Sequence, residues 1–474
     1  MKNLFKITKT DFLVYLDCPM HFWAKLNDHY EAEPTAFAES LIRQGYEVER
    51  LAQAYLYQFV ILPDPALHLS LQQSFTDGPF FARADALIRN SATQSFDLYE
   101  IKSGTSIDKK DIYDCCFQYQ VLRQQQNIQQ VYVLHLNRDY VRGDALDLAQ
   151  LFITEDISAE VIAALPVVQM GMQNALNLAQ QPDPNGIEHC YDPKNCPCPQ
   201  LCHPELPAYS IYDIGYLNRN KKRELEMLGI LEAAKVPESF PLNPVQRSFV
   251  RAVQQDQPQI DRAGIHKEME KLEFPLYFLD YETFNAAIPL YQGHHPQQQM
   301  VFQYSLHCLD RPGGSLSHTE YLCTDKVEPA VGLLAALKRE LGPVGTVLVW
   351  NKSFEMTRNK ELALVHPIYQ NFLEDLNARI YDLADFVRQG LYVHPGFKGS
   401  WSIKNVLPVM VPDLSYQDMD ISEGGQASEA WWQMVYGGLD ADQKEHTRQA
   451  LLKYCHLDTL AMVRIYDCLT SLNE

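Results

Sequence analysis

The stretch YFLDYETF, residues 277–284, constrains the fold of this chain more than any other sequence feature. An apolar run is followed there by two carboxylates, Asp280 and Glu282, with one residue between them. On a β-strand this spacing places both side chains on the same face. Like charges held this close repel and raise each other's pKa, so water, a basic partner or a cation must offset the repulsion. The stretch therefore predicts a strand that carries a charged site.

The length and composition indicate a folded protein of more than one domain. The chain has 474 residues, enough for two or three domains, and 46% of them are apolar, which excludes global disorder. No apolar run approaches the ~20 residues that span a bilayer. The N-terminal stretch is interrupted by Asp11 and Asp17 and lacks a small-residue cleavage site, so we expect no signal peptide. These features predict a cytoplasmic protein that does not bind a membrane.

The acidic composition limits the ways in which this chain could bind nucleic acid. Its formal net charge is −20, which argues against passive, charge-driven binding, because such binding needs an excess of Lys and Arg. It does not exclude an enzyme whose acidic site binds metal ions and presents them to phosphates. A solvated acidic surface is the simpler explanation.

The hydrophobic pattern predicts two α/β domains, at 1–205 and 269–474, joined by a helical connector at 206–268. The first domain ends in a Pro-rich segment, which we expect to have no regular structure. Its predicted elements are a helix at 38–59, strands at 80–88 and 96–102, a helix at 111–124 and a strand at 131–137. The second domain is predicted to contain strands beginning near 274 and at 301–308 and 346–350, and helices at 328–341, 354–365 and 445–470.

Polar residues on four consecutive predicted elements of the first domain suggest a metal site. Glu100 and Lys102 alternate along one strand and share a face, and Asp85 lies on the preceding strand. The carboxylates would hold Mg²⁺ or Mn²⁺, which prefer oxygen ligands, and the lysine would orient a metal-activated water or stabilise phosphate charge. Glu49 on the preceding helix could add a ligand, and Gln118 on the next helix could orient the nucleophile. A bare Glu-x-Lys pair also occurs on solvated strand faces, so that explanation stays open.

This ordered set resembles the RecB-type PD-(D/E)XK nuclease superfamily, in particular its CRISPR-associated iron–sulfur branch. The resemblance covers residues 1–205 and implies a restriction-endonuclease-like domain. It assigns the helix position after Gly45 to Glu49, the motif Asp to Asp85, the Glu-x-Lys pair to Glu100 and Lys102, and the trailing Gln to Gln118. The sequence departs from the pattern at Leu122, where the motif has Tyr.

The cysteines are clustered in a way that suggests metal ligation. Four of the eleven, Cys190, Cys196, Cys198 and Cys202, fall within thirteen residues, and a reducing cytosol disfavours disulfides. The same resemblance implies a [4Fe–4S] cluster held by Cys18, Cys190, Cys196 and Cys202, with Cys198 as a substitute ligand. Such a clasp would close the two ends of the domain and convert metal-binding energy into folding energy. The alternatives are a local zinc site on the four clustered cysteines and a buried, structural Cys18.

A second carboxylate set accompanies Asp280 and Glu282. Glu355 begins a helix after a later strand, following Asn351. Near the end of the chain a tyrosine and an aspartate lie four residues apart, so they share a helix face. Four carboxylates in this order could hold two divalent ions about 3.5–4 Å apart, and the tyrosine could position the attacking water or the phosphate. The last two residues of the set are Tyr454 and Asp458.

This order resembles the RNase H-like DEDD exonucleases of the tyrosine subtype, over about residues 270–474. The resemblance assigns the motif to Asp280, Glu282, Glu355, Tyr454 and Asp458, and Glu355 is a departure from the usual Asp. Asp382, in a stretch that also resembles these exonucleases, could add a polar contact or cap a helix. The combination of both halves resembles an uncharacterised bacterial family of predicted RecB-like nucleases.

The resemblances together imply a metal-dependent deoxyribonuclease with two active sites. The first would cut or resect single- or double-stranded DNA and the second would trim 3′ ends, in repair, recombination or defence. RNA is an alternative substrate, and a non-catalytic nucleic-acid-binding or assembly module with relic sites is the rival class. A basic run in the connector could guide a strand, or could simply be a solvated helix face; it comprises Arg219, Lys221, Lys222 and Arg223. The sequence indicates no particular protein partner.

Overall fold

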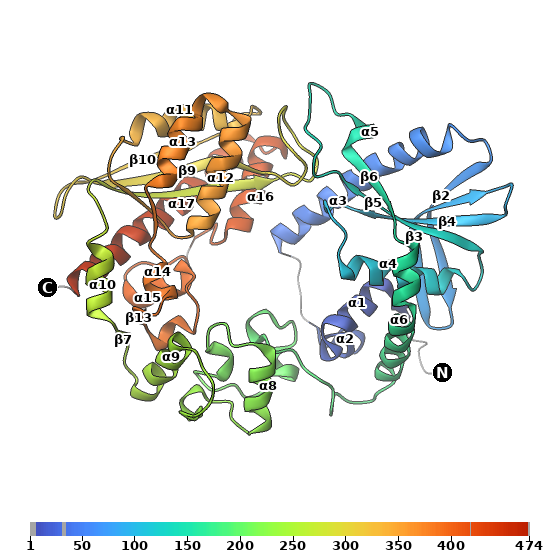
Figure 1. Cartoon of the computed structure of the whole chain (residues 1–474), viewed down its shortest axis with the longest axis horizontal. Helices are drawn as coiled ribbons and strands as arrows, with labels where there is room; N and C mark the ends of the chain where they lie inside the picture. The colour runs from blue at the N-terminus through green and yellow to red at the C-terminus, as the bar shows by residue number, and fades with distance from the viewer. Residues whose placement is uncertain (1–5, 31–34, 418, 473–474) are drawn as a thin grey trace. The chain divides into compact units, whose positions relative to one another are not determined.

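The computed structural model describes residues 6–30, 35–417 and 419–472, and the chain divides into two compact units (Figure 1). Unit 1 comprises residues 1–205 and 286–298, and unit 2 comprises residues 206–285 and 299–474. Both are mixed α/β structures with sheets of their own, which confirms the predicted class.

Unit 1 is built on a six-stranded sheet of order β1-β3-β4-β5-β6, with β2 paired to β3. The β1–β3 and β4–β5 pairs are parallel and the others antiparallel. The predicted strands at 80–88, 96–102 and 131–137 correspond to β3, β4 and β5, whereas β2 and β6 were not predicted. The strands are β1 (Ile7–Thr8), β2 (Leu67–Asp77), β3 (Phe80–Asn90), β4 (Ser95–Lys102), β5 (Ile128–Leu136) and β6 (Phe152–Asp156).

Helices cover both faces of this sheet because strand residues alternate between two hydrophobic clusters. Leu98 of β4 joins the cluster formed with α1, α4 and α6, and Tyr99 joins the cluster formed with α3. The predicted helix at 38–59 is α3, which continues as a π-helix over Leu56–Ile61. The helices are α1 (Lys9–Asp17), α2 (Pro19–Leu26), α3 (Ala36–Tyr55), α4 (Lys109–Leu122), α5 (Leu148–Leu151), α6 (Ser158–Ala179) and α7 (Pro199–Cys202).

Helix α6 corrects the expectation that no segment is long and apolar enough to cross a membrane. Its 22 residues meet the length and composition criteria for a span. This is weak evidence, since core helices pass the same test, and Val161, Val168 and Met172 of α6 pack in the core beside α4. The geometry is that of a helix packed against the core of an α/β unit.

Residues 286–298, which the sequence placed in the second domain, belong instead to unit 1. Ala287 and Ile288 are buried in the α3 cluster, and the Ala287 amide donates to Gln44 Oε1 at 2.6 Å. Gln297 Nε2 donates to the Ser103 carbonyl at 2.8 Å. A short apolar segment with these partners is stabilised by the core it contacts rather than by its neighbours in sequence.

Unit 2 contains a five-stranded sheet of order β10-β9-β8-β11-β12. β8 pairs antiparallel with β9 and parallel with β11, and β11 pairs parallel with β12. A separate ribbon joins β7 and β13. The strands are β7 (Gln259–Ile260), β8 (Leu276–Asn285), β9 (Gln299–Leu309), β10 (Leu316–Leu322), β11 (Thr346–Val349), β12 (Ile380–Asp382) and β13 (Tyr392–Val393).

The helices of unit 2 lie on both faces of this sheet. Leu279 and Leu306 join the cluster with α11, α12 and α13, whereas α16 and α17 pack against the face that carries Asp280. The helices are α8 (Arg219–Met227), α9 (Pro244–Gln255), α10 (Arg262–Met269), α11 (Pro329–Glu340), α12 (Lys352–Val365), α13 (Gln370–Ala378), α14 (Asp385–Arg388), α15 (Ile403–Met410), α16 (Gly424–Tyr436) and α17 (Ala441–Ser471).

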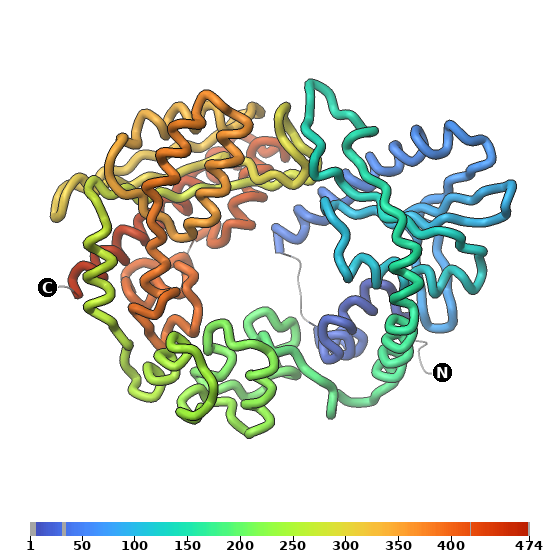
Figure 2. Tube along the Cα trace, in the orientation of Figure 1, coloured from blue at the N-terminus to red at the C-terminus, as the bar shows by residue number. Residues whose placement is uncertain are grey.

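The segment 206–268, predicted as a separate helical connector, is part of unit 2. Figure 2 shows it as short helices and turns (green). Its strand β7 pairs with β13, Phe249 of α9 is buried, and Gln246 Nε2 donates to the Gly215 carbonyl at 3.0 Å. These contacts make the segment a part of the unit rather than a free linker.

Trp431 is the largest fully buried side chain of unit 2, and its replacement tests the core. Its ring stacks on Phe302 at 4.7 Å, and its Nε1 donates to the Cys323 carbonyl at 2.7 Å. Trp431→Ala should lower the free energy of unfolding by about 3–5 kcal/mol, measured by denaturant titration. The half-buried neighbour Trp432 provides the control, and equal losses for the two alanine variants would contradict this packing.

Candidate active site and metal centre

The five residues predicted for the second carboxylate site line one cavity in unit 2, of about 350 Å³. β8 contributes two carboxylates, α12 one, and α17 an aspartate and a tyrosine on the same helix face. The cavity also contains Trp350, Asn351 and Lys404. The five residues are Asp280, Glu282, Glu355, Tyr454 and Asp458.

Burial disfavours the charged form of these carboxylates when no cation is bound. Glu282, Glu355 and Asp458 are 3–7% exposed. Desolvation, together with the neighbouring carboxylates, raises the pKa of Asp280 and of Glu282 well above the usual range. Desolvation also raises the pKa of Glu355 to about 8 and that of Asp458 to about 7. The repulsion inferred from the spacing of Asp280 and Glu282 is therefore a property of the whole cavity.

Three further side chains of this site were not found from the sequence. The Tyr416 hydroxyl donates to Asp458 Oδ1 at 2.6 Å. Lys404 lines the cavity, and its Nζ lies 5.4 Å from the ring centroid of Tyr454. Cys455 Sγ lies 3.7 Å from Asp280 Oδ2. Tyr416 and Lys404 come from segments that no local spacing links to the carboxylates, whereas Cys455 lies on α17 between Tyr454 and Asp458, where helical spacing could have indicated it.

The donor set of this cavity fits hard divalent cations. Ligand atoms of Asp280, Glu282 and Cys455 lie within 4.8 Å of one another; Glu355 and Asp458 line the same cavity outside that group. Glu355 Oε2 is buried without a hydrogen-bond partner among the described residues. Carboxylate oxygens are the ligands that Mg²⁺ and Mn²⁺ prefer. Asp382, the possible extra contact, is instead used structurally: it accepts from the Lys352 amide at the start of α12, from the Ala384 amide and from Arg388.

The raised pKa of Glu355 makes stability depend on pH. An unfolded glutamate has a pKa near 4.5 and folded Glu355 about 8, so folding favours the protonated form. The contribution of Glu355 to folding stability is complete below about pH 4.5 and is lost as the pH rises through about 8. Each pKa unit between the folded and unfolded states corresponds to about 1.4 kcal/mol of folding free energy. In metal-free buffer Glu355→Gln should therefore lose less thermal stability than wild type between about pH 5 and pH 8. Mn²⁺ should restore more stability to wild type at pH 8 than at pH 5.

Thermal denaturation across this pH range is the measurement, with the exposed Glu423→Gln as control. Parallel curves for wild type and Glu355→Gln would contradict the raised pKa.

The first predicted site is also assembled, in unit 1. Glu100 Oε1 accepts from Lys102 Nζ at 3.0 Å, and Glu100 Oε2 accepts from Gln118 Nε2 at 2.6 Å. Asp85 Oδ2 accepts from the Ile101 amide at 3.0 Å. The side-chain amide of Gln72 joins Glu49 to Asp85. The five predicted residues therefore occupy one region.

Three unpredicted residues complete this region. Lys9 Nζ lies 2.7 Å from Glu100 Oε1, so two ammonium groups share one carboxylate oxygen. Asp114 binds Lys102 Nζ at 2.6 Å. Gln72, with a φ of 53°, donates to Glu49 at 2.6 Å and to Asp85 at 3.4 Å. Lys9 and Asp114 lie on α1 and α4, outside the Asp…Glu-x-Lys motif.

The fit to a metal is incomplete in unit 1. Although burial opposes ionisation, Lys9 and Lys102 lower the pKa of Glu100 to about 2, whereas burial and Glu100 raise that of Asp85 to about 7. The described groups with three or more ligand atoms within 4.8 Å of one another do not include Glu49, Asp85 and Glu100 together. The arrangement is a buried cluster of carboxylates and ammonium groups, and we derive no metal chemistry from it.

The cysteine cluster is also formed in unit 1 and includes the distant Cys18. Hydrogen bonds from Cys18 and Cys202 lower the pKa of the Cys190 thiol far below its usual range. Cys198 Sγ lies 3.7 Å from Cys202 Sγ, and these two and Cys18 are buried together. The Met20 amide donates to the Glu188 carbonyl at 3.2 Å, so α2 contacts the cysteine segment directly.

Two histidines extend the cluster beyond the predicted cysteines. His21 Nε2 lies 3.4 Å from Cys196 Sγ, and His203 Nε2 lies 3.4 Å from Cys190 Sγ. Two groups could hold a metal ion: His21 with Cys196, Cys198 and Cys202, and Cys190 with Cys196 and His203. Soft thiolate donors suit zinc and iron–sulfur clusters, and the geometry does not choose between them.

The local structure of this segment corrects the sequence analysis. It contains a 3₁₀ turn, Pro193–Asn195, and the short helix α7, each beginning with proline. Proline is favoured at the first position of a helix because a backbone N–H at that position would have no partner within the helix, so its absence costs nothing.

The basic run lies on α8 of unit 2 as a mostly exposed helix face. Arg219 and Arg223 are exposed, the Lys221 ammonium donates to the Pro241 carbonyl, and Lys222 Nζ lies 5.7 Å from the Tyr212 ring centroid. The run follows the N-cap Asn218. The contacts give it a structural role and leave its predicted role in guiding a strand untested.

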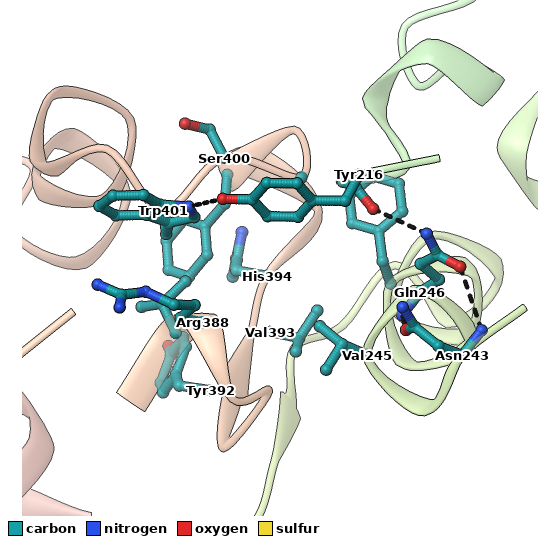
Figure 3. Close-up of a pocket in the computed structure, with 15 residues that line it drawn as sticks. Tyr216, Asn243, Val245, Gln246, Arg388, Tyr392, Val393, His394, Ser400 and Trp401 are labelled. Atoms are coloured by element: carbon teal, nitrogen blue, oxygen red, sulfur yellow. Dashed lines mark hydrogen bonds between the residues drawn. The ribbon is translucent and has the colours of Figure 1, made fainter. Parts of the chain in front are cut away.

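Unit 2 has another pocket, of about 130 Å³, with an aromatic wall (Figure 3). Tyr216 and Trp401 point toward each other and hydrogen-bond, and the Arg388 guanidinium lies 4.5 Å from the Trp401 ring centroid. Trp350, which lines the carboxylate cavity, donates from Nε1 to the Trp401 carbonyl at 3.0 Å. The Gln246 side-chain amide in this pocket is engaged with the Asn243 amide and the Gly215 carbonyl.

Comparisons with known proteins identify little beyond one segment. A model for a domain of unknown function (DUF2779) matches residues 277–402, which include Asp280, Glu282 and Glu355 but not Tyr454 or Asp458. No curated protein matches the chain. A solved structure described as the crystal structure of SSO0001 is 14% identical and covers 44% of this chain and 90% of its own, with a TM-score of 0.26. At that TM-score the likeness carries no argument.

Proposed function

We propose that this protein is a divalent-metal-dependent nuclease that hydrolyses phosphodiester bonds of DNA, with an exonuclease-like centre in unit 2. One observation carries the proposal: four carboxylates and Tyr454 from three elements line a single cavity. The sheet order, antiparallel on one side of β8 and parallel on the other, supports an RNase H-like domain.

The residues of this cavity have separable roles in the proposed reaction. Asp280, Glu282, Glu355 and Asp458 would hold Mg²⁺ or Mn²⁺, which when bound polarise the phosphodiester and activate a water for in-line attack. Tyr416 fixes the orientation of the Asp458 carboxylate by hydrogen bonding. Because Glu355 and Asp458 hold protons near neutral pH without cations, metal loading releases protons and improves with rising pH.

Tyr454 and Lys404 would act on the substrate. The Tyr454 side chain lines the cavity beside Lys404, in a position to orient the attacking water or the scissile phosphate. The lysine supplies positive charge where the phosphate would enter. The second pocket, which is lined by Tyr216 and Trp401, could bind a nucleotide base by stacking.

Unit 1 is proposed as a second nucleic-acid-processing region of the RecB-like type. Lys9 and Lys102 place two ammonium groups against Glu100, and both could bind a backbone phosphate. The cysteine cluster is proposed to hold a [4Fe–4S] centre, because Cys18 contacts Cys190 and Cys202; zinc is the alternative.

The test is the activity of anaerobically purified protein on end-labelled single- and double-stranded DNA and matched RNA, with Mg²⁺ or Mn²⁺. Wild type is compared with Lys102→Ala and Asp280→Ala. If each variant removes a different part of the product ladder, the protein is a two-site nuclease. An intact substrate under every condition would favour the non-catalytic binding module, and cleavage of RNA alone would make it a ribonuclease.

A further inference from the structure

Three histidines from three elements of unit 2 lie against one another, outside the carboxylate cavity. They are His307 on β9, His318 on β10 and His456 on α17. The ring centroids are 4.4 Å apart for His307 and His318, 4.8 Å for His307 and His456, and 4.3 Å for His318 and His456. One ring nitrogen from each residue lies within 4.8 Å of the other two.

The fold brings these rings together by two independent contacts. His307 and His318 are direct cross-strand partners in the antiparallel β9–β10 ladder, so their side chains share a face. α17 packs against β9 and β10 on this face and contributes His456. The nearby Thr459, on the same helix, binds His307 Nδ1 at 2.8 Å.

The simplest structural explanation is a polar core held by hydrogen bonds. Ser305 Oγ contacts His318 Nε2 at 2.9 Å, and Ser305 Oγ contacts Thr459 Oγ1 at 2.7 Å. This explanation accounts less well for the imidazoles themselves. His318 Nε2 faces His456 Nδ1 at 3.2 Å and already contacts Ser305 Oγ, so two polar atoms converge on one nitrogen.

The protonation states of His307 and His318 suit metal binding. Burial, reinforced by the neighbouring histidines, lowers the pKa of His307 to about 3 and that of His318 to about 4. Both are therefore neutral at neutral pH, which is the form that binds metals. Glu320 lies 3.9 Å from His318 Nε2 and could add an oxygen, and the His318 side chain is 23% exposed, so solvent reaches the site.

We infer that His307, His318 and His456 form a binding site for a divalent transition-metal ion of the zinc class. Three imidazoles with an open fourth position are typical of zinc sites, and imidazole favours Zn²⁺, Ni²⁺ and Cu²⁺ over the hard ions suited to the carboxylate cavity. Binding would tie α17 to β9 and β10. The inference is independent of the proposed nuclease activity.

The test is zinc stoichiometry in the full-length protein, measured by equilibrium dialysis and elemental analysis. His318→Ala and His456→Gln should each bind one Zn²⁺ equivalent fewer than wild type. His446→Gln, on the exposed face of α17, should bind as wild type does. The cysteine cluster could also take zinc, but it is unchanged in these variants, so its zinc contributes equally to each protein and cancels in the one-equivalent difference.

Thermal stability provides the second readout. Added Zn²⁺ should raise the Tm of wild type and of His446→Gln more than that of the two site variants. If His318→Ala does not fold, His456→Gln decides, since its side chain is partly exposed and keeps hydrogen-bonding groups. Equal zinc stoichiometry and equal Tm shifts for wild type and folded His456→Gln would overturn the inference and leave a polar core.

Discussion

Glu282→Gln is expected to remove hydrolysis at the unit 2 cavity while leaving the fold intact. The amide has the shape of the carboxyl but cannot carry the negative charge that a divalent ion requires. Loss of one metal ligand should remove several kcal/mol of transition-state stabilisation, roughly 10²–10⁴-fold in rate. The readout is the single-turnover rate of 3′-end trimming of labelled DNA with Mg²⁺ or Mn²⁺.

Stability should not fall in this variant, and that separates it from a folding defect. Burial already favours the protonated, neutral form of Glu282, which the amide resembles. The control is Asp413→Asn, an exposed carboxylate paired with Arg464 in the same unit, which should keep wild-type activity. If Glu282→Gln trims DNA as fast as Asp413→Asn does, Glu282 is not a metal ligand for the reaction.

Cys202→Ser is expected to release the metal proposed for the cysteine cluster and to destabilise unit 1 strongly. Cys202 contacts Cys18, Cys190 and Cys198 and is a member of the group formed with His21, Cys196 and Cys198, so its loss removes one ligand from that group. Structural metal sites contribute on the order of 10 kcal/mol to folding, so the variant should be protease-sensitive within residues 1–205. Limited proteolysis and elemental analysis of anaerobically purified protein measure both effects.

The matched control is Cys468→Ser, a half-buried thiol on α17 of unit 2. It should retain metal and protease resistance. Iron with equivalent sulfide in wild type would support the [4Fe–4S] proposal, and zinc alone would support the alternative. Unchanged metal content in Cys202→Ser would show that Cys202 is dispensable for metal binding.

The sequence predicted the residues of both carboxylate sites that local periodicity brings onto one face. Asp280 and Glu282 share a face because strand side chains alternate, and Tyr454 and Asp458 share a face because four residues are about one helical turn. Both periodicities act over only a few residues, so they can be recognised in the sequence without knowledge of the tertiary structure. The paired Glu100 and Lys102 were found in the same way.

The partners that these residues require were not predictable from spacing. Lys9 reaches Glu100 across 91 positions of sequence, and Tyr416 reaches Asp458 across 42. His21 and His203 lie beside the predicted cysteines, but only the packing of α2 against the cysteine segment gives them a role.

The sequence by itself determined the mixed α/β class, the elements around each motif and the side chains that share a face. The tertiary structure decided which distant elements meet: it assigned residues 206–268 to unit 2 and residues 286–298 to unit 1, and it placed His307, His318 and His456 together. The reason is physical. Backbone periodicity acts over a few residues, whereas strand pairing and helix packing bury apolar surface contributed by segments far apart in the chain.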